Sequence, residues 1–247
     1  MSVPAVGASQ SAGRLRSTVR AGGLALVLGA LAFMAVFAYL AARFDYPAIL
    51  DGEARTVLPR LLATGSAGRA AWALYAFLPL LWLPAGAGAW LALRRHAPGS
   101  MLLGLLWAAV ASIAMMLGLM RWPSMHWHLA GLYGTASPEQ QQVLAAVFDG
   151  LNTYLGNYIG EFLGELSVSM FFLHSAWTIL RSRAAPAWTG WMGIITAAAG
   201  LVGMFRNVTT AVAPVAAVNN YLLPLWMIVF GVVLFRLRTP DDQAVAT

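Results

Sequence analysis

The sequence predicts an all-α fold: a polytopic membrane protein built as a six-transmembrane-helix bundle, with the N and C termini cytoplasmic. Three observations predict this class. Six apolar stretches are each about 19 to 24 residues long, and a helix needs about 20 residues to cross the hydrocarbon layer. Only 10% of the residues are charged and 60% are hydrophobic, whereas a soluble domain has about 25% charged residues. Arginines gather at alternate ends of the stretches, which the positive-inside rule assigns to the cytoplasm.

The apolar stretches run over residues 21–42, 70–93, 101–120, 158–180, 187–205 and 215–235. The arginines at their predicted cytoplasmic ends are Arg14, Arg16 and Arg20, then Arg94 and Arg95, then Arg181 and Arg183, and finally Arg236 and Arg238. Short loops with such a bias set the orientation of a membrane protein. The opposite ends, which carry most of the unusual polar residues, are therefore predicted to lie on the outer face.

The basic charge has a simple source. The formal charge of +6 comes from arginine, because the chain contains no lysine. Most of the excess lies in short loops beside the spans, so it indicates topology and attraction to anionic membrane lipid rather than a nucleic-acid partner. The lack of cysteine excludes disulfides, thiolate metal ligands and cysteine nucleophiles. We expect membrane lipid as a partner and no bound cofactor.

The chain divides into three parts. Residues 1–20 are predicted to be a disordered basic cytoplasmic tail, residues 21–238 the six-helix transmembrane domain, and residues 239–247 a short cytoplasmic tail. The first apolar stretch is too long for a signal-peptide core, so we expect it to be retained. In the segment 44–68, an apolar pattern suits an interfacial helix on the outer leaflet. Pro79 and Pro84 should kink the second span, which opens space inside a bundle.

The clearest helix start precedes the fourth span. Ser137, Pro138, Glu139 and Gln140 provide, in order, an N-cap, a first-turn proline, an acidic residue and a capping-box glutamine. An amphipathic pattern then runs directly into the span. A straight helix to residue 180 would be about 65 Å long, so this extension either projects from the outer face or bends at its glycines. We favour the bend.

Polar residues inside the fourth span recur at helical spacing. Asn157, Glu161 and Glu165 stand four residues apart and share one face. Carboxylates at membrane depth usually face the bundle interior. Arg121 and Arg206 end the third and fifth spans on the same side, and either could pair with a glutamate or bind a carboxylate. A purely structural ion pair explains these residues equally well.

Further polar residues converge on the same half of the membrane. The outer ends of the spans carry Asp45, Asp149, Asn207, Asn219 and Asn220. Singly, each is explained by solvation in a loop. Together they favour an outward-facing polar pocket.

Two histidines lie among aromatic residues after the third span. His126 and His128 offer imidazole ligands for a metal. Trp127 lies between them in the sequence, and Trp122 precedes them. Aromatic residues at a membrane boundary are, however, expected as interfacial anchors. We favour the interfacial interpretation and predict no metal, while keeping both histidines as candidate ligand contacts.

Three short segments resemble a known family. FDYPAIL (residues 44–50), RWP (121–123) and FDGLNTYLGNYIGEFLGEL (148–166) are similar to a bacterial family of six-span membrane proteins catalogued as domain of unknown function 4386. The resemblance implies a multi-pass protein of the bacterial inner membrane. The family often has histidine directly after the glutamate that matches Glu161, where this chain has Phe162. This departure weakens any transfer of a metal or acid-base role.

Three functions remain open. The first is binding of a small or lipidic ligand in an outer-leaflet pocket formed by Arg121, Asn157, Glu161, Glu165 and Arg206. The second is a membrane-embedded enzyme acting on a lipid or isoprenoid, with Glu161 or Glu165 as general acid or base. The third is ion or proton transport, which is disfavoured because charged groups are sparse in the inner half.

Overall fold

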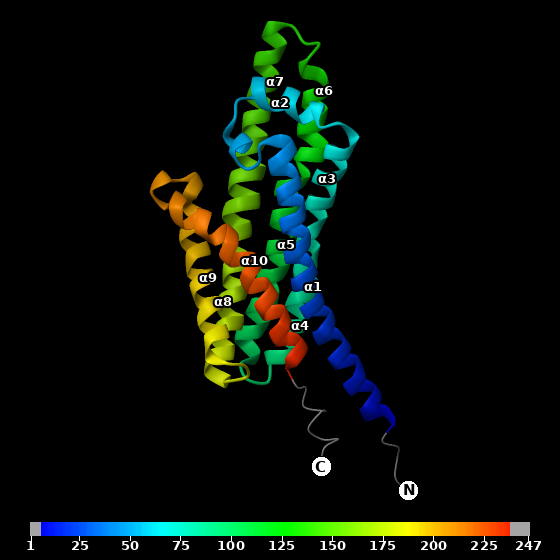
Figure 1. The fold of residues 1–247 in the computed structure, drawn as a ribbon, viewed down its shortest axis with the longest axis vertical. Helices are drawn as coiled ribbons and strands as arrows, with labels where there is room; N and C mark the ends of the chain where they lie inside the picture. Colours follow the sequence, from blue (N-terminus) through cyan, green and yellow to red (C-terminus); the bar gives the residue numbers. More distant parts are fainter. Residues whose placement is uncertain (1–5, 238–247) are drawn as a thin grey trace.

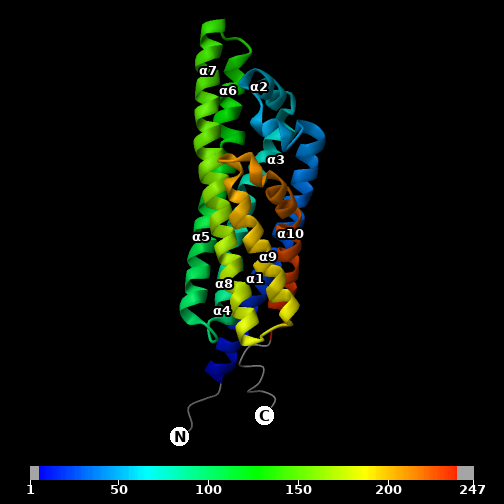
Figure 2. The same ribbon diagram turned by 90° about the vertical axis from the view of Figure 1, so that its left-hand side faces the viewer.

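A computed structural model describes residues 6–237 of the chain. This part is helical and contains no strand, and six helical stretches in it are long and apolar enough to cross a membrane. These stretches are Gly13–Phe44, Gly65–Leu93, Pro98–Tyr133, Pro138–Ser182, Ala187–Asn207 and Thr210–Arg236. Figures 1 and 2 show them as an elongated bundle. The predicted fold class is confirmed.

The first span begins earlier than the sequence indicated. Helix α1 runs over Val6–Phe44, so the structure has residues 6–20 helical where we expected a disordered tail. Alanine, glutamine and arginine are good helix formers, which lets the apolar helix continue toward the N-terminus. Residues 1–5 and the predicted tail 239–247 lie outside the described residues.

The segment between the first two spans forms two short helices, η1 (Ala48–Asp51) and α2 (Ala54–Ala63). Helix α2 buries Val57, Leu58 and Leu61 completely, while Leu62 stays 44% exposed. Its neighbours are the helices α6 (Trp127–Tyr133) and α7 (Pro138–Leu151). The predicted amphipathic helix is therefore present, and its apolar side packs against protein.

The second span is interrupted as its prolines predicted. Helix α3 (Gly65–Phe77) leads into the 3₁₀ turn η2 (Leu78–Leu81), which contains Pro79, and then into α4 (Trp82–Leu93). A proline removes one backbone donor and clashes with the preceding turn, which favours such a break. Pro84 lies inside α4. Leu78, Pro79 and Leu81 of η2 line the cavity described below.

The third and fourth spans extend well beyond the others. Helix α5 (Pro98–Met120) continues through the π-helical turn η3 (Trp122–His126) into α6. Helix α7 continues through the π-helix η4 (Asn152–Leu163) into α8 (Gly164–Ser182). The two extensions form a projecting pair with α2 beside them (Figure 1).

The predicted bend before the fourth span is wrong. The helix from Pro138 to Ser182 is continuous over 45 residues, and Figure 2 shows it without a sharp bend. Gly160 packs against the backbone of α5 at Gly118, and Gly156 packs against the Arg121 side chain. These glycines therefore allow close packing that keeps the helix along α5.

The chain ends with α9 (Ala187–Gly203), the short turns η5 (Met204–Asn207) and η6 (Thr210–Val212), and α10 (Ala213–Arg236). The main helix contacts close a ring in the order α1, α4, α5, α8, α9, α10 and back to α1. The N-terminal end of α1 and the C-terminal end of α10 lie at the same end of the bundle (Figure 1). Which end faces the cytoplasm stays a prediction from the arginines.

Two buried clusters fill the ring. The lower one is built around Trp82, Phe171, Phe172, Trp226 and Phe230. The upper one lies under α2 and the projecting helices, around Phe44, Trp72, Trp122 and Phe148. The residues predicted to form a pocket lie where these two clusters meet.

Candidate functional site

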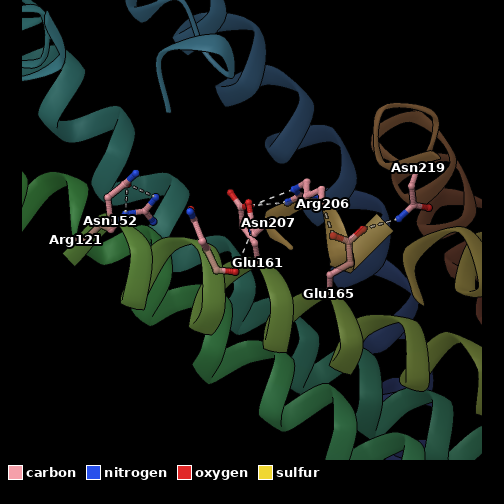
Figure 3. A network of polar contacts seen from close by, with 8 residues as sticks. Arg121, Asn152, Glu161, Glu165, Arg206, Asn207 and Asn219 are labelled. Atoms are coloured by element: carbon pink, nitrogen blue, oxygen red, sulfur yellow. Dashed lines mark hydrogen bonds and ion pairs between the residues drawn. The ribbon is translucent and has the colours of Figure 1, made fainter. Parts of the chain in front are cut away.

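The π-helix η4 carries two of the candidate residues, Asn157 and Glu161, and Glu165 follows in the first turn of α8. The hydrogen bonds of a π-helix run from residue i to i+5, so side chains four or five residues apart still share a face. Asn152, Glu161 and Glu165 are thereby turned toward the bundle interior along one helix (Figure 3). π-Helical geometry is rare, and the π-bulges that occur within α-helices are often found at functional sites. The sequence predicted the shared face but not the π geometry.

Arg206, at the end of the fifth span, pairs with both glutamates. Its Nε and Nη2 each lie 3.1 Å from Glu161 Oε2. Its Nη1 donates to Glu165 Oε2 at 2.9 Å. The side chain of Glu165 is 10% exposed and that of Glu161 is 23% exposed. The ion pair predicted between these spans is therefore present.

Two asparagines complete this group, which we call the Arg206 cluster: Glu161, Glu165, Arg206, Asn207 and Asn219. Asn207 Nδ2 donates to Glu161 Oε2 at 2.8 Å and to the carbonyl of Asn157 at 3.1 Å. Asn219 Nδ2 donates to Glu165 Oε1 at 3.0 Å. The cluster links α8 and η4 to η5 and α10.

The sequence placed both asparagines at outer span ends without assigning them partners. Only contact between distant helices reveals that Asn207 and Asn219 bind the glutamates. Asn157, in contrast, takes part in the hydrogen bonds through its backbone carbonyl.

Arg121 forms a separate polar group. Its Nε and Nη2 donate to Asn152 Oδ1 at 3.2 and 3.1 Å, and its Nη1 donates to the carbonyl of Gly118. Asn152 Nδ2 in turn donates to the carbonyl of Leu50 at 3.0 Å. Arg121 is only 4% exposed, and within residues 6–237 it has no carboxylate at ion-pair distance. The alternative pairing of Arg121 with a glutamate is thus not seen.

A cavity of about 160 Å³ lies between the Arg206 cluster and Arg121. Its polar lining consists of Tyr46, Tyr75, Arg121, Glu161, Glu165, Arg206, Asn219 and Asn220. Apolar side chains from α1, η2, α4, α5 and α10 supply much of the rest, including Leu26, Leu81 and Met227. Four predicted site residues therefore meet at one cavity, whereas Asn157 does not line it.

The cavity is partly open, and some of its lining residues on α1 and α10 are exposed or half-buried. Helices α1 and α10 contact each other closely near their lower ends, where a Cβ on Gly23 would lie 2.7 Å from the carbonyl oxygen of Gly231. Above this contact the two helices diverge (Figure 1), and both contribute residues to the lining, including Gly29 of α1 and Leu223 of α10. The lining also includes the exposed Asn220 and the half-buried Phe33.

The two histidines lie in different environments. His126 is fully buried between Trp122 and Phe148, with ring centroids 4.7 and 4.6 Å away. His128 is exposed. Neither lines the cavity, and the described residues contain no group of three or more histidines or carboxylates that could hold a metal ion. The structure therefore separates these residues from the other candidates.

Replacement of His126 with phenylalanine is expected to maintain or raise stability. Both ring nitrogens are buried and have no hydrogen-bond partner within the described chain, and a buried unsatisfied polar group costs about 1 to 3 kcal/mol. Phenylalanine keeps the aromatic contacts without this penalty. Thermal unfolding in detergent should show an unchanged or higher midpoint for His126→Phe and no change for the exposed control His128→Phe. A clear loss of stability for His126→Phe alone would show that the imidazole has a required partner.

Comparison with known proteins shows the family. The sequence profile described as "Domain of unknown function (DUF4386)" matches residues 21–234, which is most of the chain. No curated protein and no solved structure matches the chain. The match includes most of each of the six apolar helices and every residue of the cavity lining. This multi-pass membrane protein therefore belongs to the DUF4386 family.

Proposed function

We propose that this protein lies in a bacterial inner membrane and binds a small amphipathic molecule, lipidic or otherwise membrane-soluble, in the cavity, without covalent chemistry. The observation that carries the proposal is the cavity itself. Its lining combines charged and amide groups with apolar side chains, and it includes exposed or half-buried residues of α1 and α10. Such a combination of apolar walls and a few polar groups is typical of small-molecule sites.

The hydrogen bonds favour binding over acid-base chemistry. A general acid or base must exchange a proton with its substrate, but Arg206 already binds both Glu161 and Glu165. Asn207 and Asn219 occupy further positions on the same carboxylates. We infer that the glutamates serve to fix the shape and charge of the cavity.

The packing below the cavity argues against a transport path. The lower half of the ring is filled by a continuous apolar cluster that includes Trp82, Phe172 and Phe230. An ion would need polar groups or water along this half of the bundle. The cavity is better suited to hold a molecule than to pass one through.

Filling the cavity tests this function. Gly29 lines it on α1, and a side chain there would meet Met227 and Leu81. Gly29→Leu should therefore occupy the space in which the ligand lies. The matched control is Ala35→Leu, on the exposed side of the same helix.

Native mass spectrometry of protein released from its own membrane provides the measurement. We expect one molecule per chain to co-purify with the wild type and with Ala35→Leu, and to be lost at least about tenfold in Gly29→Leu. Equal occupancy in all three proteins, or no bound molecule in the wild type, would refute ligand binding in this cavity.

A further inference from the structure

The charges around the cavity constrain the ligand's own charge. The charged residues of the lining are Arg121, Arg206, Glu161 and Glu165, so the formal charges cancel. A charged ligand would leave a net charge in a region of low dielectric, which is unfavourable without a counter-ion. A neutral ligand leaves the balance intact.

The remaining hydrogen-bonding capacity indicates the ligand's polar groups. Glu161 accepts all its bonds through Oε2, and in the described residues its Oε1 accepts none. Arg121 uses three of its five N–H groups. The cavity therefore offers an acceptor suited to a hydroxyl and donors suited to a carbonyl or hydroxyl oxygen.

The size and the walls of the cavity indicate a ring. Its volume of about 160 Å³ is close to that of an apolar cavity of about 150 Å³ that holds benzene. Aromatic side chains of Phe33, Tyr46, Tyr75, Trp82 and Trp122 contribute to the lining. Aromatic rings pack favourably in offset and edge-to-face arrangements. An open chain with several rotatable bonds would gain less from such walls.

The partial opening of the cavity explains how a larger molecule would fit. The space accommodates one ring, but its lining extends to the half-buried Phe33 of α1 and Leu223 of α10 and to the exposed Asn220. We infer that an apolar substituent on the ring would leave past Phe33 and Leu223.

From these four features we propose that the ligand is a neutral single-ring compound with hydroxyl or carbonyl oxygens, of the phenol or quinone class, and that any apolar tail leaves between α1 and α10. This assignment depends on the proposed binding function, which it makes more specific.

Four probes separate charge from ring shape. They are 4-propylphenol, 4-propylbenzoate, 4-propylbenzylammonium and the open-chain 1-nonanol. Binding to the full-length protein in nanodiscs is measured by tryptophan fluorescence and, independently, by the shift in thermal unfolding. Gly29→Leu and Leu223→Trp, which fill the cavity from opposite helices, are the blocked variants, and Ala35→Leu is the control.

The expected result is that 4-propylphenol binds the wild type at least about tenfold more tightly than either charged probe and than 1-nonanol, and that both blocked variants lose this preference. Tightest binding of a charged probe would overturn the neutral assignment, and tightest binding of 1-nonanol would overturn the ring. In both cases sensitivity to the blocked variants would leave the proposed function standing. Equal binding of all probes, or binding of none, would also overturn the assignment. The co-purification experiment decides the proposed function independently.

Discussion

Replacing Arg206 with leucine is expected to lower the free energy of unfolding by about 3 kcal/mol. The change leaves Glu161 and Glu165 inside the bundle without their shared cation, and breaking one partner of a buried ion pair costs about 3 to 5 kcal/mol. We take the lower end of this range because the Arg206 side chain is 29% exposed. For a chain of this size the unfolding midpoint should fall by roughly 6 to 12 °C.

The matched control is the exposed pair of Arg60 and Asp45. The two side chains are 3.3 Å apart but 54% and 66% exposed, and exposed ion pairs contribute only about 0 to 1 kcal/mol. Arg60→Leu should therefore change the unfolding midpoint little. Similar small effects for Arg206→Leu and Arg60→Leu in thermal unfolding would show that the Arg206 cluster is solvated and does not hold the helices together.

Adding one methyl group at Gly118 is expected to destabilise the protein by about 2 to 3 kcal/mol. A Cβ at this position would collide with the Cα of Gly160 and lie 3.0 Å from the carbonyl oxygen of Leu155. Both are backbone atoms, so no side chain can rotate away. Overpacking of this kind costs about 1 to 3 kcal/mol, and here α5 must move away from η4.

Gly150→Ala serves as the control because a Cβ there meets nothing within 4 Å. Alanine is favoured over glycine in a helix by about 1 kcal/mol, so this variant should be as stable as the wild type or slightly more stable. Thermal unfolding of the two alanine variants gives the comparison. If Gly118→Ala were as stable as Gly150→Ala, the close approach of α5 and η4 would be incorrect.

The spans were predictable because their signals are local. Twenty apolar residues in sequence specify a membrane helix, and Ser137 with Gln140 forms the predicted capping box. The proline break at Pro79 is likewise a local property of the backbone. These features depend on neighbouring residues in the chain and so are visible without the fold.

The errors arose where tertiary packing decided the outcome. Glycine suggested a bend, but Gly160 faces Gly118 on another helix, a contact that no local pattern reveals. The same holds for the partner of Arg121. Asn152 stands 31 residues away and appears no different from other polar residues in the sequence.

Part of the candidate site was predictable because it depends on local spacing in the sequence. Glu161 and Glu165 share a face because of their spacing, and charged groups inside a span must find partners. Arg206 was one of two candidates, and the structure selects it. The cavity and its opening depend on how α1 and α10 cross, which the sequence does not encode at short range.

An experimental density map of the wild-type protein, in nanodiscs made from its own membrane lipids, would show whether the cavity holds a ligand. We predict ordered non-protein density in the cavity, in contact with Arg121 and Glu161 and extending between α1 and α10. The Arg206 cluster should hold the same hydrogen bonds around it. A map with side chains closed over the cavity and no density beside Arg121 would contradict ligand binding in this cavity.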